Sequence, residues 1–257
     1  MKIIAVVSAK GGVGKTSISA NVSAALARMG RTVLGVDLDP QNALRLHFGV
    51  SPQHFDGLAR ASLSGTNWRD SILLGPSGDY VLPFGQVNED DRQAFEEILR
   101  TEPNFLLEQL QSLNLAHNAL VVLDTPPGPS VYLRQALQAA NVSLIVVLAD
   151  AASYATIPMI VSLIEQYCLQ QPHFIDYFYL VNQVDRSRQL ASDVADVIGS
   201  QLQGRQIGVV HLDQSIPEGL ACNQDVLSYD PHSRGAHDIM ECAAALDRIV
   251  SDQPGTY

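Results

Sequence analysis

The sequence predicts an α/β protein in which a doubly wound, mostly parallel sheet is flanked by helices on both faces. Apolar runs typical of strands alternate with helical patterns along all 257 residues, and this alternation indicates successive βαβ units. The runs are apolar throughout, as at 119–123, where Ala-Leu-Val-Val-Leu has no polar face. Because such a strand is buried on both faces, the sheet that it joins is expected to be parallel and covered on both sides.

The elements follow in order along the chain. The run at 2–8 predicts the first strand, and the helix after it, at 15–29, can end at Gly30 because glycine adopts the left-handed cap conformation without a Cβ clash. Further strands are expected at 32–37, 79–83, 119–124, 142–149, 174–182 and 207–212. Further helices are expected at 91–113, 130–140, 154–170, 187–202 and 234–251.

The alternation also predicts how the chain is divided. The stretch 42–79 is broken up by glycines and is expected to be the least regular part. No linker, repeat or low-complexity tract interrupts the pattern. We therefore expect a single domain over 1–251 and a disordered tail at 252–257.

Composition limits the classes of function. The formal net charge is −11 and the pI is near 4.9, which disfavours nucleic acid as the main partner because duplex-binding proteins carry a basic stripe. No apolar stretch approaches the ~20 residues that span a bilayer. The amphipathic segment 240–250 carries Glu241, Asp247 and a single basic residue, Arg248, so we interpret it as a docking helix and not as a membrane anchor.

Cysteine and histidine positions indicate no metal centre. Cys168, Cys222 and Cys242 form no CxxC pair, and no histidine stands at metal-ligand spacing. The apolar neighbours of the three cysteines predict buried, reduced thiols. Together with the lack of a recognisable signal peptide, this indicates a cytoplasmic protein.

A glycine loop directly after the first strand predicts a phosphate site. Residues 8–16 read Ser-Ala-Lys-Gly-Gly-Val-Gly-Lys-Thr, and backbone N–H groups of such a loop surround phosphate oxygens at a helix N-terminus. Lys15 is expected to reach the terminal phosphates, and the Thr16 hydroxyl to bind Mg²⁺. Ala9 replaces the first glycine of the common P-loop, and a second lysine, Lys10, suggests that one ammonium acts elsewhere. The other nucleotide-binding positions of this loop are Gly11, Gly12, Val13, Gly14 and Ser17.

Three aspartates at the ends of two predicted strands face the same edge. Asp37 and Asp39 follow the second strand, and Asp124 ends the strand at 119–124. Because Mg²⁺ takes one or two carboxylates together with phosphate oxygens and water, we expect Thr16, Asp39 and Asp124 to surround a metal ion. Asp39 is also placed to orient an attacking water. Asp37 could share these roles or only form structural hydrogen bonds.

The three motifs together resemble the deviant-Walker-A ATPases of the ParA/MinD family, a SIMIBI-class group of P-loop NTPases. They are residues 10–16, the Asp-Leu-Asp-Pro-Gln at 37–41 and the Asp-Thr-Pro-Pro-Gly at 124–128. The resemblance implies a homodimer that forms with ATP and Mg²⁺ and hydrolyses ATP slowly to ADP. It implies that Lys10 crosses to the phosphates held by the other subunit, so that Lys10, Lys15 and Asp39 are the catalytic residues.

A narrower resemblance concerns residues 44–92. The segments 44–50, 56–61, 67–70 and 82–86 are similar to the cellulose-biosynthesis branch, the BcsQ proteins. This implies protein partners in the cellulose synthase complex, including a small BcsR-type subunit, and peripheral recruitment to the inner membrane or cell pole through them. Trp68, the only tryptophan, can serve equally as a plug under an irregular surface segment.

The nucleobase end offers two interpretations. By the resemblance, Asn182 contacts adenine, and Asp213 is a further base contact in a segment where His211 stands in place of the family's proline. Residues 182–185, Asn-Gln-Val-Asp, also resemble the Asn-Lys-x-Asp signature of GTPases, in which Asp185 would read guanine. We expect Asp185 instead to cap the following helix, His211 to be a simple hydrogen-bonding residue, and ATP to be preferred over GTP.

Three functions fit this chemistry. We expect an ATP-controlled dimerisation switch that supports cellulose secretion. The alternative is a ParA-like ATPase that partitions DNA, plasmids or other cargo, for which Arg186 and Arg188 are the surface cations near the rim. A metabolic enzyme that phosphorylates or activates a small substrate is the third, although no segment indicates a substrate pocket.

Overall fold

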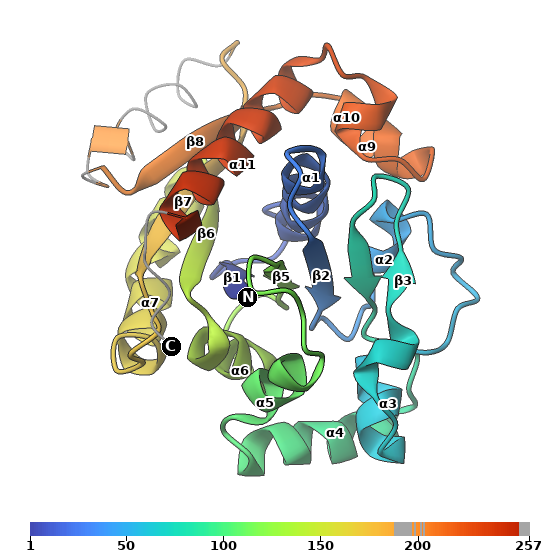
Figure 1. Ribbon diagram of the computed structural model, residues 1–257. Coiled ribbons are helices and arrows are strands. Elements are labelled where there is room, and N and C mark those ends of the chain that lie inside the picture. Colours follow the sequence, from blue (N-terminus) through green and yellow to red (C-terminus); the bar gives the residue numbers. More distant parts are fainter. Residues whose placement is uncertain (188–196, 198, 201, 203, 252–257) are drawn as a thin grey trace.

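A computed structural model describes residues 1–187, 197, 199–200, 202 and 204–251. Its centre is an eight-stranded sheet in the order β3-β4-β2-β5-β1-β6-β7-β8, in which every neighbouring pair is parallel except β3 and β4 (Figure 1). The strands are β1 Lys2–Val7, β2 Val33–Asp37, β3 Leu73–Leu74, β4 Tyr80–Leu82, β5 Leu120–Asp124, β6 Val142–Leu148, β7 Asp176–Val184 and β8 Gln206–His211. The mostly parallel, doubly wound fold that the sequence predicts is confirmed.

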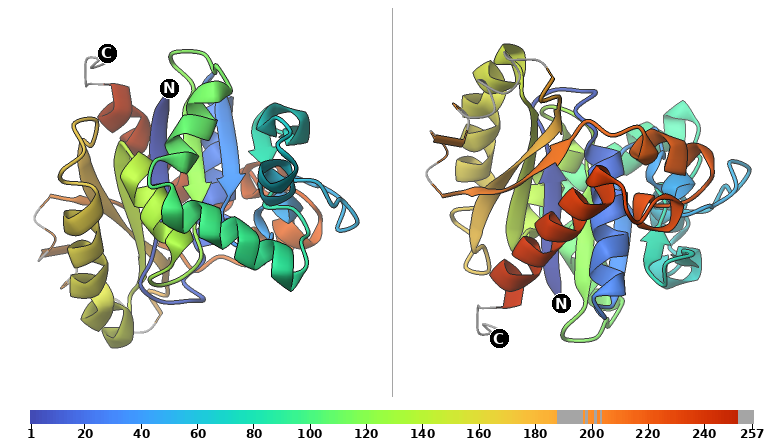
Figure 2. Two further views of the ribbon diagram at one scale, coloured as in Figure 1. Left: turned by 90° about the horizontal axis from the view of Figure 1, so that it is seen from below. Right: turned by 90° about the horizontal axis from the view of Figure 1, so that it is seen from above.

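Helices cover both faces of the sheet (Figure 2). The α-helices are α1 Lys15–Arg28, α2 Leu44–His47, α3 Leu58–Ser64, α4 Glu89–Thr101, α5 Phe105–Ser112, α6 Val131–Ala139, α7 Ala151–Tyr167, α9 Ser215–Ala221, α10 Val226–Tyr229 and α11 Arg234–Ser251, and η1 is a 3-10 helix at Trp68–Ser71.

Strand β1 shows how the two faces are filled. Ile3, Ala5 and Val7 pack into a core with residues of α4, α5, α6 and α7, whereas Ile4 and Val6 pack with residues of α1 and α11. All five side chains are buried, as expected because neighbouring residues of a strand point to opposite faces. The central strand is therefore apolar from Ile3 to Val7, and the polar residues of the glycine loop follow at its carboxyl end.

One expectation about helices needs correction. The helix expected at 91–113 is two helices, α4 and α5, separated at residues 102–104. The break falls at Pro103, because a proline disfavours helical conformation in the residue before it, here Glu102. The stretch 42–79 also contains short regular elements, namely α2, α3, η1 and β3. The helix expected at 187–202 and the tail at 252–257 lie largely or wholly outside the described residues.

Buried side chains settle two smaller expectations. Trp68 is only 1% exposed, its ring meets Phe105 edge-on, and its Nε1–H donates to Ser62 Oγ, so it fills the core below α3 and α5. Cys168 and Cys242 are buried, but Cys222 is exposed at the end of α9, which corrects the expectation for that thiol. In the part of the chain that the structure describes, no helix is long and apolar enough to cross a membrane.

Candidate functional site

The carboxyl ends of β1, β2 and β5 bring the sequence motifs together. In the register of the sheet Asp124 lies beside both Val6 and Asp37, so the glycine loop after β1 and the two aspartates share one edge. The side chains of Asp37, Asp124 and Lys15 are all buried there. In doubly wound sheets this edge is where ligands bind.

The glycine loop has a backbone that side chains would obstruct. Gly14 has a φ of +85°, and a Cβ at this position would lie 2.5 Å from Asn182 Nδ2. The same Asn182 amide donates to the Val13 carbonyl at 2.8 Å, which ties the loop to β7. On the other side, Gly128 N donates to the Ser8 carbonyl at 3.1 Å. The loop is therefore held in place before any anion binds, and the first N–H groups of α1 remain available to one.

Lys15 is a buried cation without an ion pair. Its side chain is 7% exposed, and no carboxylate among the described residues lies within the 4.0 Å of an ion pair. Burial lowers the pKa of Lys15, against the attraction of Asp124 and Asp39. A phosphate group bound next to Lys15 would supply the negative charge that no described carboxylate provides in an ion pair.

Asp124 provides an acceptor suited to a metal ion. Burial raises the pKa of Asp124 to about 6, against hydrogen bonds from Thr16 and Ser19 and the charge of Lys15. Ser19 Oγ donates to Oδ1 at 2.9 Å, whereas Oδ2 is enclosed without a partner among the described residues. An enclosed carboxylate oxygen of this kind, on a residue that also interacts with the Thr16 hydroxyl, fits the outer coordination of Mg²⁺.

Asp37 and Asp39 have different surroundings. Asp37 accepts from the backbone N–H groups of Asp39 at 3.0 Å and Leu44 at 2.9 Å, and burial, followed by the nearby Asp124, raises its pKa well above the usual value. It therefore shapes the segment after β2. Asp39 is half-buried, and its Oδ1 accepts from Gln41 N at 2.9 Å, while nothing described donates to Oδ2.

Lys10 pairs within its own chain. Its Nζ lies 3.6 Å from Asp150 Oδ2, and the two side chains are 42% and 41% exposed. Asp150 also caps α7, because its Oδ1 accepts from Ser153 N at 2.6 Å. An exposed pair of this kind contributes about 0–1 kcal/mol. Lys10 can therefore leave Asp150 at little cost.

A cavity of about 220 Å³ adjoins the glycine loop and includes Gly14 and Ser17 in its wall. Asn182 and Asp213 both line it; the Asn182 amide nitrogen donates to the Val13 carbonyl, and both carboxylate oxygens of Asp213 accept from backbone N–H groups. Asp213 accepts from Ser215 N at 2.8 Å and from Gly235 N at 2.7 Å, which joins the starts of α9 and α11. Asp185 is not among the described residues that line this cavity, and its Oδ1 accepts from Ser187 N and Oγ in a local turn.

His211 also lines the cavity, and its partner could not be found from motifs. Asp238 Oδ2 accepts from both His211 N at 2.9 Å and His211 Nδ1 at 2.7 Å, and Asp238 Oδ1 accepts from Arg234 Nε at 3.0 Å. A residue other than proline at 211 brings a backbone N–H that needs an acceptor, and Asp238 provides it. The sequence therefore signals that residue 211 needs an acceptor, but not that Asp238 supplies it.

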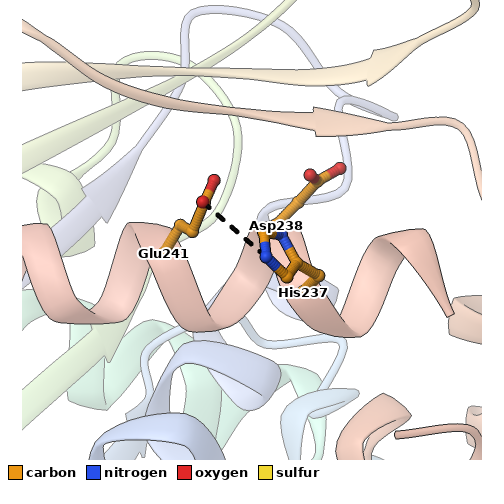
Figure 3. Close-up of side chains that lie close together, drawn as sticks. All are labelled: His237, Asp238 and Glu241. Carbon is orange, nitrogen blue, oxygen red and sulfur yellow. Dashed lines mark ion pairs between the residues drawn. The ribbon is translucent and has the colours of Figure 1, made fainter. Parts of the chain in front are cut away.

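One cluster contradicts the expectation that no histidine stands at metal-ligand spacing. His237, Asp238 and Glu241 lie on one side of α11 with candidate ligand atoms within 4.8 Å of one another (Figure 3). His237 and Glu241 are 68% and 70% exposed and pair with each other, while Asp238 is occupied by His211 and Arg234. The cluster is therefore no metal centre comparable to the site at Asp124.

Comparison with known proteins identifies similar sequences over nearly the whole length of the chain. A family model described as "Cellulose biosynthesis protein BcsQ" matches residues 1–245. The cellulose biosynthesis protein BcsQ of Salmonella typhimurium is 30% identical over 252 residues, which cover 95% of this chain and 93% of that protein.

Solved structures agree on the fold. The septum site-determining protein MinD of Pyrococcus horikoshii, complexed with Mg-ADP, aligns with a TM-score of 0.78 and 23% identity over 99% of each chain. Cobyrinic acid a,c-diamide synthase of Mycobacterium smegmatis also aligns with a TM-score of 0.78 and 23% identity, over 98% of this chain and 96% of that one. At these identities the two alignments establish the fold alone.

Proposed function

The chain belongs to the cellulose biosynthesis protein BcsQ family of P-loop ATPases, and from this premise we propose that it is a Mg²⁺-dependent ATPase whose ATP-controlled dimerisation supports the bacterial cellulose synthase complex. The observation that carries the proposal concerns Lys15 and Asp124 Oδ2 at the glycine loop. Among the described residues, the buried Lys15 has no ion pair and the enclosed Asp124 Oδ2 has no hydrogen-bond partner. A cation and an acceptor kept apart in this way suit a nucleotide phosphate and its metal ion.

In this proposal the chain holds ATP or ADP through the loop residues Gly11 to Ser17. Lys15 binds the terminal phosphates, and Thr16, Asp124 and Asp39 surround Mg²⁺, which neutralises phosphate charge when it is bound. Asp39 orients the attacking water through the oxygen that Gln41 leaves free. The relative crystallised with Mg-ADP supports the choice of cofactor.

The dimer depends on Lys10. It has to leave Asp150 and reach the phosphates of a second copy, whose γ-phosphate then holds both chains together. Loss of that phosphate by hydrolysis, which we propose to be slow, releases the dimer. The lifetime of the ATP-bound dimer is then the signal that partner proteins detect.

The cellulose synthase complex is proposed as the partner because of the printed name of the family and of the relative in Salmonella typhimurium. We place the chain in the cytoplasm as one domain over 1–251, recruited to the inner membrane or cell pole by protein partners that include a small BcsR-type subunit.

Light scattering tests the switch. With ATP and Mg²⁺ the mass should double, and with ADP it should stay that of a monomer. Capture of tagged chain from cells that produce cellulose should recover the synthase complex with ATP. A monomer under all nucleotide conditions would contradict the switch, and salt-sensitive DNA binding with ATP would favour the partitioning alternative.

A further inference from the structure

One residue in the wall of the cavity next to the glycine loop has a polar atom that no role proposed so far requires. The His211 side chain is 12% exposed, and its Nε2 is enclosed without a hydrogen-bond partner among the described residues. Asn182 and Asp213 were expected to contact the base. In the structure the Asn182 amide donates to the Val13 carbonyl, and Asp213 accepts from the backbone N–H groups of Ser215 and Gly235. His211 is therefore a side chain of this wall whose ring is held in one orientation by Asp238 and whose second nitrogen is uncommitted among the described residues.

Asp238 determines which nitrogen of His211 carries the proton. In a neutral imidazole one nitrogen donates and the other accepts, and the hydrogen bond of one nitrogen sets the tautomer. Asp238 Oδ2 lies 2.7 Å from Nδ1, and a carboxylate that already accepts from Arg234 and from the His211 backbone has no proton to donate. In the neutral ring the hydrogen therefore lies on Nδ1, and Nε2 is an acceptor.

From this arrangement we infer that His211 is a specificity-determining residue that distinguishes adenine from guanine. Its Nε2 accepts a hydrogen bond from the 6-amino group of adenine, whereas guanine presents the O6 carbonyl, a second acceptor, at the same place. The inference rests on the proposed nucleotide-binding function and adds to it the base and the residue that selects it. Because Nε2 is closed off from water in this structure, the base has to displace neighbouring side chains of the cavity wall to reach it.

A purely structural role for His211 predicts a different outcome. If the His211–Asp238 pair only satisfied the backbone N–H at this position, replacement of the ring would disturb the cavity for every ligand alike. Base reading concerns the 6-position alone. Three diphosphates separate the two roles: ADP, GDP and purine riboside diphosphate, which lacks any group at position 6.

Calorimetric titration of the full chain with these three probes is the test. In the wild type we expect ADP to bind about tenfold more tightly than purine riboside diphosphate, the effect of one hydrogen bond, and GDP to bind most weakly. His211→Phe should weaken ADP by about tenfold and leave purine riboside diphosphate unchanged. His232→Phe, at an exposed position, is the matched control and should behave as the wild type.

Nitrogen NMR of the wild type keeps the inference testable if His211→Phe does not fold. In protein with ¹⁵N-labelled histidine, His211 Nε2 should be unprotonated and should shift with ADP but not with purine riboside diphosphate. A proton on Nε2 in the ADP complex, or equal weakening of all three ligands by His211→Phe, would overturn the inference. If the wild type binds none of the three, the proposed function fails as well, so the two failures are distinguishable.

Discussion

At the carboxyl ends of β1, β2 and β5, a single buried residue carries a charge that no described carboxylate neutralises in an ion pair. Lys15 is buried and its pKa is lowered by that burial, an effect which the more distant Asp124 and Asp39 offset only in part. The ammonium is therefore less favourable in the folded chain than in the unfolded one. A site that favours binding in this way does so at the expense of its own stability.

Replacement of Lys15 separates these two effects. Lys15→Met keeps the length of the side chain and removes the charge, so ATP binding should weaken by about 100-fold while the midpoint of thermal unfolding stays the same or rises. Calorimetric titration and a circular-dichroism melt measure the two quantities. Lys2→Met, outside the loop, is the control and should change neither. Unaltered ATP affinity would show that Lys15 does not hold the phosphates.

Asp39 allows a test of charge against shape. Its Oδ1 accepts from Gln41 N, a bond that Asn can also form. Both Asp39→Ala and Asp39→Asn should slow ATP hydrolysis by about 100-fold, the lower range for a lost general base, and should prolong the ATP-bound dimer. Phosphate release and light scattering record these effects. Normal turnover in Asp39→Asn would mean that the carboxylate serves only the turn.

At the scale of elements, the sequence predicts best where long patterns are uninterrupted. Helix α1 and strands β1, β5 and β6 lie within two residues of expectation because an apolar run or a helical pattern continues through each. The break between α4 and α5 was missed because helical spacing continues on both sides of Pro103. Strand β3 has two residues and helix α3 has seven, so the strand is too short to show an alternation and the helix too short to show a helical period.

The candidate site likewise has a part that the sequence predicts and a part that it does not. The glycine loop and its aspartates are local motifs at strand ends, so both their identity and their meeting point follow from the sequence. The bonds of Asp213 to Gly235 and of His211 to Asp238 join residues more than twenty positions apart. Because no local pattern encodes such pairs, the sequence could name the residues of the cavity but not what their polar atoms bind.

The β3–β4 hairpin carries a buried acid with no full partner. Asp79 is 2% exposed, and its Oδ1 has no partner among the described residues. Burial raises the pKa of Asp79 to about 6, and the nearby charge of Asp225 adds to this shift. A hydrogen bond from the backbone N–H of Asp79 and the charge of Arg28 both oppose it. Asp225 meanwhile ties the hairpin to α10, since it accepts from Ser77 Oγ at 2.5 Å.

This acid makes stability depend on pH. A carboxyl group whose pKa is raised on folding holds a proton that the unfolded chain has already released, so the free energy of unfolding falls as pH rises from about 4 to about 6. Asp79→Asn should remove the contribution of this group, while those of Asp37 and Asp124 remain. The variant should be more stable than the wild type by about 1–3 kcal/mol near pH 7, with no difference near pH 4. Urea unfolding across this range measures it.

A matched substitution at an exposed acid controls for the loss of charge. Asp70→Asn should follow the wild-type pH dependence, because its carboxyl is in solvent in both states. Parallel stability curves for the wild type and Asp79→Asn would show that this carboxyl is not the group responsible.

At the scale of the whole molecule, the association of two chains has to overcome the repulsion between their negative net charges. Each chain carries a formal net charge of −11, and bound triphosphate adds to it, so two copies that meet at their phosphate edges repel each other. Lys10 is a cation at this edge, and its bond to Asp150 is exposed and weak. The proposed dimer therefore depends on a lysine that can leave its own chain.

Two substitutions at this pair should move the dimer in opposite directions. Lys10→Ala should keep ATP affinity, because Lys15 holds the phosphates in the same chain, but should lose the ATP-dependent dimer. Asp150→Asn retains a side chain that can cap α7 while releasing Lys10, so dimers should form at lower protein concentration than in the wild type. Light scattering over a dilution series with ATP and Mg²⁺ measures both, and Lys2→Ala controls for the loss of a surface lysine. If Lys10→Ala still dimerises with ATP, the second lysine of the loop acts within its own chain, and the clasp between two copies must come from other groups.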